Sequence, residues 1–253
     1  MNKWIGIILL IFAAAQGFGQ IRLDKLEIKA RQTYTIEESD VLVVDTLIMR
    51  DSSRIVLNKE KSENIINVKV LIVNRGAQII GNGANGEAGK VGANGVRQNA
   101  PCRVGGNAAE GATGGNGTGG LNLSLYVNQL IITGSLTINL NGGNGGTGGR
   151  GGRGGDGGGG TRVCRGGNGG AGGNGGNGGN LDMRCTRCQD LHLIQGHQLI
   201  INNYGGFAGV GANGGTGGLA GLGPNQDGKN GEKGLPGANG VAGKQGIIRF
   251  EKK

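Results

Sequence analysis

The stretch from Gly142 to Gly160 places glycine at two of every three positions, and this pattern constrains the fold of the chain more than any other feature. Glycine in an element interior costs conformational entropy, and glycine-rich runs are often flexible linkers. A strict period of three indicates structure instead, because three residues per turn put every third residue on one edge. An edge without Cβ atoms lets backbones approach closely enough to hydrogen-bond. We therefore predict paired polyglycine-II rods, with a flexible matrix segment lacking an ordered bundle as the alternative.

Three segments of the sequence resemble one another at a spacing of about sixty residues. Each contains an apolar run, a marker glycine (Gly76, Gly134 or Gly196), an alternating apolar strand and then a glycine tract. Each tract is interrupted near its middle, which predicts a turn and therefore two rods per repeat. The six predicted rods are Gly81–Gly95, Gly105–Gly120, Gly142–Gly160, Gly166–Gly179, Gly205–Gly223 and Gly228–Gly246.

The segment 20–70 has no glycine tract, and its apolar residues alternate or run at strand length, as in VLVVDTLIM and NIINVKVLIV. We interpret this segment as a β cap, with a small separate sandwich as the alternative. The predicted fold class is all-β and non-regular: N-terminal β-solenoid-like strands, then three repeats of strand plus paired polyglycine-II rods in a six-rod bundle. The predicted boundaries are a signal peptide at 1–19, the cap at 20–70, and repeats at 71–129, 130–190 and 191–253.

The N-terminal sequence MNKWIGIILLIFAAAQGFGQ has the parts of a secretory signal peptide: a positive Lys3, an apolar run, and small residues for cleavage. An uncleaved anchor is the alternative. No second apolar stretch of membrane length follows, so we expect no transmembrane segment after cleavage. We therefore expect a secreted, extracellular or cell-surface protein, with the periplasm as a further possibility. With 61 glycines in 253 residues and 3% aromatic residues, the composition does not suit an ordinary globular core.

The formal net charge of +9 is typical of a solvated basic surface, with salt-sensitive binding of an anionic polysaccharide or of extracellular DNA as the alternative. The stretch GGRGGRGG has the composition of RNA-binding segments, but it lacks the aromatic residues that stack on bases, and the chain is predicted to be exported. We therefore expect no specific nucleic acid partner. An anionic surface polymer or a glycan is the expected partner class.

The side-chain edge of the central rods presents amides and guanidinium groups at regular spacing, which suits glycans or other surface polymers. The same residues are equally compatible with simply keeping the bundle soluble. The candidate ligand face consists of Asn144, Thr147, Arg150, Arg153, Asp156, Asn168, Asn174 and Asn177.

Four cysteines in an exported chain predict disulfides. Cys102 and Cys164 occupy equivalent turns in the first two repeats, so we favour a Cys102–Cys164 bridge. Cys185 and Cys188 then pair through a turn, because three extended residues would hold their Cα atoms too far apart. The other two pairings remain open.

A zinc site is the alternative use of the second cysteine pair. Its ligands would be Cys185, Cys188, His192 and His197, whose spacing is close to that of a zinc knuckle. Against this site, His192 alternates with Leu191 and Leu193 on a predicted strand, and the predicted compartment is oxidising. The chain shows no catalytic constellation, so we expect neither an enzyme nor a cofactor.

Triplets such as GGAGGNGGNGG resemble the polyglycine-II bundles of glycine-rich springtail antifreeze proteins and of some phage tail-tip adhesins. They also resemble the glycine-rich repeats of mycobacterial surface proteins. The resemblance covers the tracts alone and implies a secreted, non-catalytic structural or adhesive protein, with ice binding as the alternative. Arg150, Arg153 and Asp156 interrupt the flat face of small residues that ice binding requires. The segment Gly228–Gly246 also fits the collagen-like G-X-Y triplet, although Pro236 is its one proline within a triplet.

Overall fold

A computed structural model describes residues 20–100, 103–158, 172–222 and 228–252. The predicted signal peptide lies outside the described residues. Within the described ranges, nearly all regular secondary structure is β-strand. The elements are β1 (Gln20–Ile28), β2 (Thr33–Thr35), β3 (Val41–Met49), β4 (Arg54–Val56), β5 (Glu63–Val73), β6 (Ala77–Ile80), β7 (Asn122–Ile132), β8 (Leu136–Asn139), β9 (Leu181–Arg187), α1 (Leu191–Ile194), β10 (Leu199–Asn202) and β11 (Ile248–Lys252).

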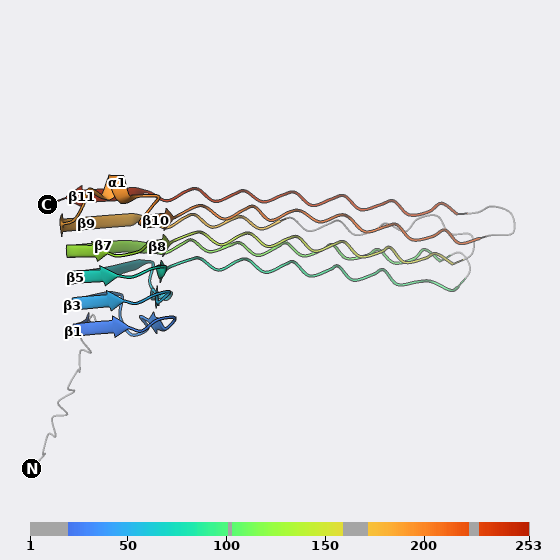
Figure 1. Ribbon diagram of the computed structural model, residues 1–253. Coiled ribbons are helices and arrows are strands. Elements are labelled where there is room, and N and C mark those ends of the chain that lie inside the picture. Colours follow the sequence, from blue (N-terminus) through green and yellow to red (C-terminus); the bar gives the residue numbers. More distant parts are fainter. Residues whose placement is uncertain (1–19, 101–102, 159–171, 223–227, 253) are drawn as a thin grey trace, which may run out of the picture.

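The strands form two sheets in which every paired strand is parallel to its neighbour. One sheet has six strands in the order β1-β3-β5-β7-β9-β11, and the other has five in the order β10-β8-β6-β4-β2. The chain alternates between the sheets and advances by one strand at each turn (Figure 1). Gln20 pairs with Val41, and Val41 pairs with Ile65, so these early turns take 21 and 24 residues. Later turns are longer because each contains a glycine insertion.

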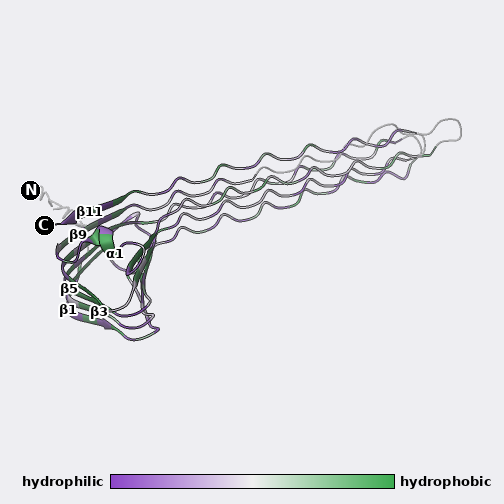
Figure 2. Cartoon of the chain, turned by 45° about the horizontal axis from the view of Figure 1, so that its top comes forward, coloured by the Kyte–Doolittle hydropathy of each residue, from purple (hydrophilic) through white to green (hydrophobic). Residues whose placement is uncertain are grey.

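The core lies between the two sheets and consists of side chains stacked one turn apart. The alternating pattern of β3 and β5 buries every second residue over much of each strand, as expected for one face of a pleated strand. Leu42 pairs with Ile66, which in turn pairs with Leu125, and all three are fully buried. The apolar colour gathers on the strands, whereas the long extensions alternate between polar and apolar residues (Figure 2). Burial of apolar side chains therefore stabilises the strand region.

Two turns show how the chain closes this coil. The turn between β4 and β5 is held by the buried side chains of Asn58 and Asn64: the Asn58 N–H donates to Asn64 Oδ1 at 2.9 Å, and Asn64 Nδ2 donates to the Asn58 carbonyl at 3.2 Å. Between β5 and β6, Gly76 has φ +70°, a conformation that glycine adopts without the Cβ strain of other residues. The β4–β5 connection is short, whereas the equivalent connection between β6 and β7 contains T1 and T2.

Six glycine tracts, T1 to T6, project together from one end of the sheets as long extended segments (Figure 1). T1, T3 and T5 follow β6, β8 and β10, so they extend the five-stranded sheet. T2, T4 and T6 lead into β7, β9 and β11, so they extend the six-stranded sheet. The described parts are T1 (81–98), T2 (103–120), T3 (142–158), T4 (172–179), T5 (203–222) and T6 (228–246).

Backbone hydrogen bonds arrange the tracts in two layers. Within one layer, the Gly86 N–H of T1 donates to the carbonyl of Asn144 in T3, and the Gly145 N–H of T3 donates to the carbonyl of Phe207 in T5, each at 2.8 Å. Within the other layer, T2 donates to T4 and T4 donates to T6 in the same way. Between layers, the Gly146 N–H of T3 donates to the Gly115 carbonyl of T2 at 2.8 Å. These bonds recur every third residue, so neighbouring tracts satisfy one another's amide groups.

The tracts lie so close together that many glycines have no room for a side chain. A Cβ built on Gly143 would lie 1.8 Å from the Ala84 carbonyl oxygen, well inside any real contact distance. The obstructing atom belongs to a backbone held in its own hydrogen bonds. Glycine is therefore required at this position by the neighbouring chain.

The predicted fold class was wrong. We predicted N-terminal strands followed by three repeats of strand plus paired polyglycine-II rods, whereas the structure is organised by two parallel sheets that extend from β1 to β11. The strands of segment 20–70 pair in register with those that follow, since β3 pairs with β5 and β5 with β7. The spacing of about sixty residues is therefore one turn of this two-sheet coil, lengthened by an inserted pair of glycine tracts.

Candidate binding faces of the glycine tracts

The outward side chains of T1, T3 and T5 form one surface, which we call the T3 face. Asparagine side chains align these tracts in rows. In one row, the Asn144 N–H donates to Asn85 Oδ1 at 2.8 Å, and the Phe207 N–H donates to Asn144 Oδ1 at 2.9 Å. The adjoining row repeats the pattern with Asn82, Asn141 and Tyr204, at 3.0 and 2.9 Å. Each asparagine oxygen thus holds the next tract in register.

The same face contains five of the predicted ligand residues, all on T3. Asn144, Thr147, Arg150 and Arg153 are exposed and follow one another every third residue. Arg153 forms a 2.7 Å ion pair with Asp156, and Asp156 Oδ1 also accepts the Leu219 N–H at 2.9 Å. Asp156 therefore links T3 to T5 through its side-chain oxygen, as the asparagines do. Within the described ranges, Arg150 has no ion-pair partner.

The structure does not bring the whole predicted ligand set together. Asn174 and Asn177 belong to T4 and lie on the outer side of the other layer, which we call the T4 face. Their Oδ1 atoms accept the N–H groups of Val241 and Lys244 in T6, at 2.8 and 2.9 Å. Asn168 lies outside the described residues. The predicted residues that can act together are therefore those of T3.

Sequence reasoning missed the aromatic residues on the T3 face. Tyr204 and Phe207 of T5 are 56% and 76% exposed, and Val210 follows them three residues later at 61%. T5 contains no charged residue between 203 and 222. The period of three could have predicted this row of exposed apolar residues. Tyr204, Phe207 and Val210 occupy the same triplet position on T5 that polar residues occupy on T3.

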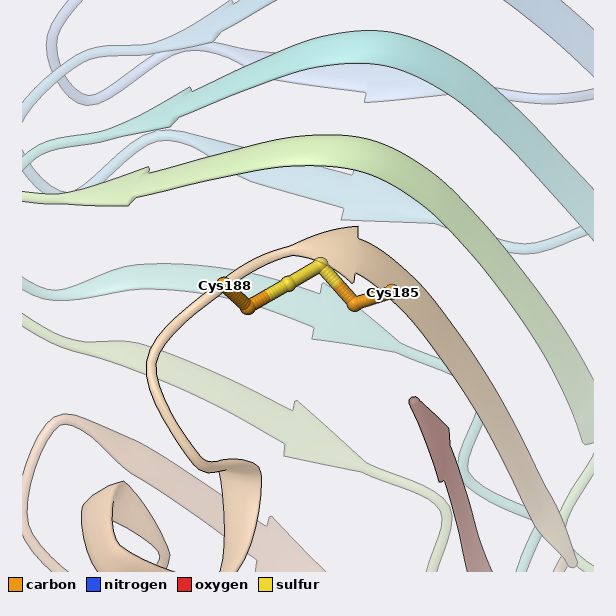
Figure 3. Close-up of a disulfide and its surroundings, with 2 residues drawn as sticks. All are labelled: Cys185 and Cys188. Atoms are coloured by element: carbon orange, nitrogen blue, oxygen red, sulfur yellow. A yellow bond between two sulfur atoms is a disulfide. The ribbon is translucent and has the colours of Figure 1, made fainter. Parts of the chain in front are cut away.

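The second cysteine pair forms a disulfide at the end of β9 (Figure 3). The Cα atoms of Cys185 and Cys188 are 6.1 Å apart, within the usual range for a bridge. Cys185 is buried and pairs in register with Val127, so it occupies a core position of the sheet. The predicted Cys102–Cys164 bridge lies outside the described residues.

The two histidines lie near this bridge without forming a metal site with it. His192 lies on the short helix α1, where a strand was predicted, because Asp190 Oδ1 accepts the His192 N–H at 3.0 Å and caps a single turn. The His192 ring packs edge-on against Phe250, with centroids 5.0 Å apart. Within the described ranges, no three His, Cys, Asp or Glu side chains group as potential metal ligands.

Charged groups on the strand region form local pairs away from the T3 face. Hydrogen bonds from Arg50 and Lys25 hold the pKa of Glu27 below its ordinary value. The hydrogen bond to Asp182 raises the pKa of Arg184, whose guanidinium also lies 5.3 Å from the centre of the Tyr126 ring. These pairs link residues of the sheets and bring no acid–base constellation to the tracts.

No protein family and no curated protein sequence matches this chain. Among solved structures, the chain is weakly similar to a springtail antifreeze protein from Granisotoma rainieri, described as a nine polyproline type II helical bundle on which crystal waters match the ice lattice. The two are 25% identical, and the match covers 64% of this chain and 92% of that chain. The TM-score is 0.12, so this likeness carries no argument about fold or activity. In the described part of the chain, no helix is both long and apolar enough to cross a membrane.

Proposed function

We propose that this chain is a secreted or cell-surface protein with a structural and adhesive role, which binds surface polymers through its tract faces and performs no catalysis. The sequence supports export, because the N-terminal segment has the pattern of a signal peptide. The layered tracts support a structural role, because their hydrogen bonds join neighbouring segments along their described lengths.

The observation that carries the proposal is the arrangement of side chains on the T3 face. Backbone bonds between T1, T3 and T5 fix the side chains in rows, and the exposed Thr147, Arg150 and Arg153 follow one another on T3. A regular row of hydrogen-bonding and cationic groups complements a polymer whose own groups repeat. Together with the net charge of +9, Arg150 favours an anionic polymer.

A sedimentation assay of the purified mature chain with an acidic polysaccharide, alginate, tests this proposal. We expect binding that weakens as salt is added, and that falls in the Arg150→Glu variant because the free cation is reversed. Lys244→Glu is the matched control, since it makes the same charge change on the T4 face and should retain most of the binding. Equal losses in the two variants would show net charge alone at work and would contradict a binding role of the T3 face.

Export and ice binding are tested separately. Mass spectrometry of the protein recovered outside the expressing cell should show an N-terminus close to Gln20. A protein that stays inside the cell with Met1 intact would contradict secretion. A thermal-hysteresis measurement distinguishes the ice-binding alternative, for which we expect no effect because Arg150 and Arg153 stand out from the T3 face.

A further inference from the structure

Two exposed aromatic side chains occupy adjoining rows at the root of T5. Tyr204 and Phe207 follow directly after β10, whereas Tyr34, Tyr126 and Phe250 are all partly buried. A role in the core does not explain why these residues are aromatic, because Phe207 is 76% exposed and therefore buries little apolar area on folding. In a chain with 3% aromatic residues, two neighbouring exposed rings indicate a contact surface.

The asparagines beside these rings are held in one orientation. Asn141 and Asn144 direct their Oδ1 atoms to the N–H groups of Tyr204 and Phe207. Asn82 and Asn85 direct theirs to the N–H groups of Asn141 and Asn144. Because a side-chain amide also has two N–H donors, each asparagine keeps its NH₂ group for another partner. The two rows thus combine two rings with four oriented NH₂ groups.

The spacing of the rows fits a ligand that is extended and repetitive. Tyr204 and Phe207 are three residues apart along an extended tract, a separation of about 10 Å. One small ring therefore cannot contact both aromatic side chains. The rows contain no Arg or Lys, so they offer no contact suited to a phosphate backbone. Sugar rings have an apolar face that stacks on aromatic side chains and hydroxyl oxygens that accept from amide N–H groups.

We infer that these two rows bind a linear polysaccharide that lies along T5. One sugar ring stacks on Tyr204 and a later ring stacks on Phe207, while Asn141 and Asn144 donate to the hydroxyl oxygens beside each ring. The inference rests on the proposed function in treating the T3 face as the binding surface. It adds that the recognised feature is the sugar ring itself, so that a neutral polymer also binds. The order along the face then places the neutral-sugar contacts near the sheets and Arg150 farther out.

The test measures affinity electrophoresis of the full mature chain in gels that contain hydroxyethylcellulose, a neutral linear polysaccharide, or alginate. We expect the wild-type protein to be retarded by hydroxyethylcellulose. The double variant Tyr204→Ala/Phe207→Ala should lose about tenfold or more of this affinity, as expected when the main aromatic contacts of a binding surface are removed. The matched control is Val241→Ala/Ile247→Ala, which removes two exposed apolar side chains from the T4 face and should bind as the wild type does.

A second variant separates binding from the structural task of the asparagines. Asn144→Asp retains an oxygen to accept the Phe207 N–H but loses the NH₂ donor, so it should keep the wild-type melting temperature and bind hydroxyethylcellulose more weakly. Asn177→Asp makes the same change on the T4 face, where the oxygen accepts the Lys244 N–H, and should not alter binding.

The outcomes distinguish this inference from the proposed function. Wild-type affinity for hydroxyethylcellulose in the Tyr204→Ala/Phe207→Ala variant would overturn the inference. Retardation by alginate alone, sensitive to Arg150→Glu, would also overturn it and would leave the proposed function standing. Failure of the wild-type protein to bind either polymer would overturn both.

Discussion

The strand region and the glycine tracts of this chain maintain the same neighbour relationships by opposite means. In the strand region, each turn stacks large apolar side chains, such as Leu42 on Ile66, between two hydrogen-bonded sheets. In the tracts, the contacts between neighbouring tracts are backbone to backbone, and positions such as Gly143 have no space for even a Cβ atom. The strand region buries side chains, whereas the tracts bury backbone groups.

The strand region and the tracts nevertheless share one register. β8 pairs with β10, so Asn139 lies beside Asn202, and a few residues later the oxygen of the Asn144 side chain accepts the Phe207 N–H at the same separation of 63 residues. The sheets thus bring the roots of the tracts together in register. Once aligned, the tracts need only hydrogen-bonding groups and the absence of side chains. We therefore expect the strand region to act as the folding template for the tracts.

The largest expected effect comes from weakening that template. Leu71 is fully buried in β5 and pairs with Leu47 and Leu130 of the neighbouring strands. Leu71→Ala should lower the free energy of unfolding by about 2–5 kcal/mol, the usual cost of such a cavity in a packed core. If the sheets align the tracts, then proteolysis within T3 should accelerate in this variant, although the substitution lies in the strand region. Unchanged protection of T3 would show that the tracts hold together without the template.

A smaller but still large effect should follow from one methyl group in the tracts. Gly143→Ala places a Cβ on the Ala84 carbonyl oxygen, and the strain should destabilise the protein by about 1–3 kcal/mol or more. Gly119→Ala is the matched control, because the nearest atom to its Cβ, the Asn177 carbonyl oxygen, is 3.6 Å away. Thermal unfolding followed by circular dichroism should show a lower midpoint for the first variant alone. Equal midpoints would mean that the tracts are not packed as tightly as the strand region.

The sequence predicted local features of both regions better than it predicted their connection. The alternation in VLVVDTLIM and NIINVKVLIV predicted strands, and β3 and β5 cover those segments. The period of three marked glycines such as Gly143 that face a neighbouring backbone. The fold class was nevertheless wrong, because strand pairing over 58 residues between β7 and β9, or 67 between β9 and β11, depends on partners that no local pattern identifies.

The candidate site illustrates the same limit. Arg150 and Asn174 have the same place in a glycine triplet, yet they lie on different faces because T3 and T4 belong to different layers. Layer membership is set by which sheet a tract adjoins, and this cannot be read from a triplet. The helix α1 was also missed, since four residues are too few to show helical periodicity and its cap, Asp190, acts on a single turn.

Removing one asparagine link between tracts should cost an intermediate amount of stability. Asn174 Oδ1 accepts the Val241 N–H from T6, so Asn174→Ala should remove one hydrogen bond between tracts and cost about 0.5–1.5 kcal/mol. Asn174→Asp keeps an acceptor oxygen and should recover most of that stability. Chemical denaturation of the two variants measures the difference. If both variants lose equal stability, then the side-chain oxygen is not the group that joins T4 to T6.

The smallest expected effect on stability comes from the ion pairs that join successive turns of the strand region. Between the tracts, asparagine side chains make the corresponding links. Arg50 donates to Glu27 of the previous turn at 2.7 Å, and this bond together with Lys25 lowers the pKa of Glu27. A carboxylate whose pKa is lowered in the folded state contributes stability above its unfolded pKa and loses it as the pH falls through the folded value. Glu27→Gln should therefore reduce the melting temperature slightly at neutral pH, and the deficit should vanish at a pH below the lowered pKa of Glu27, where the carboxyl group is protonated. The deficit of Asn174→Ala should persist at both pH values, because an amide does not titrate. A deficit of Glu27→Gln that stayed constant across this range would show that Glu27 links the turns through packing and not through its charge.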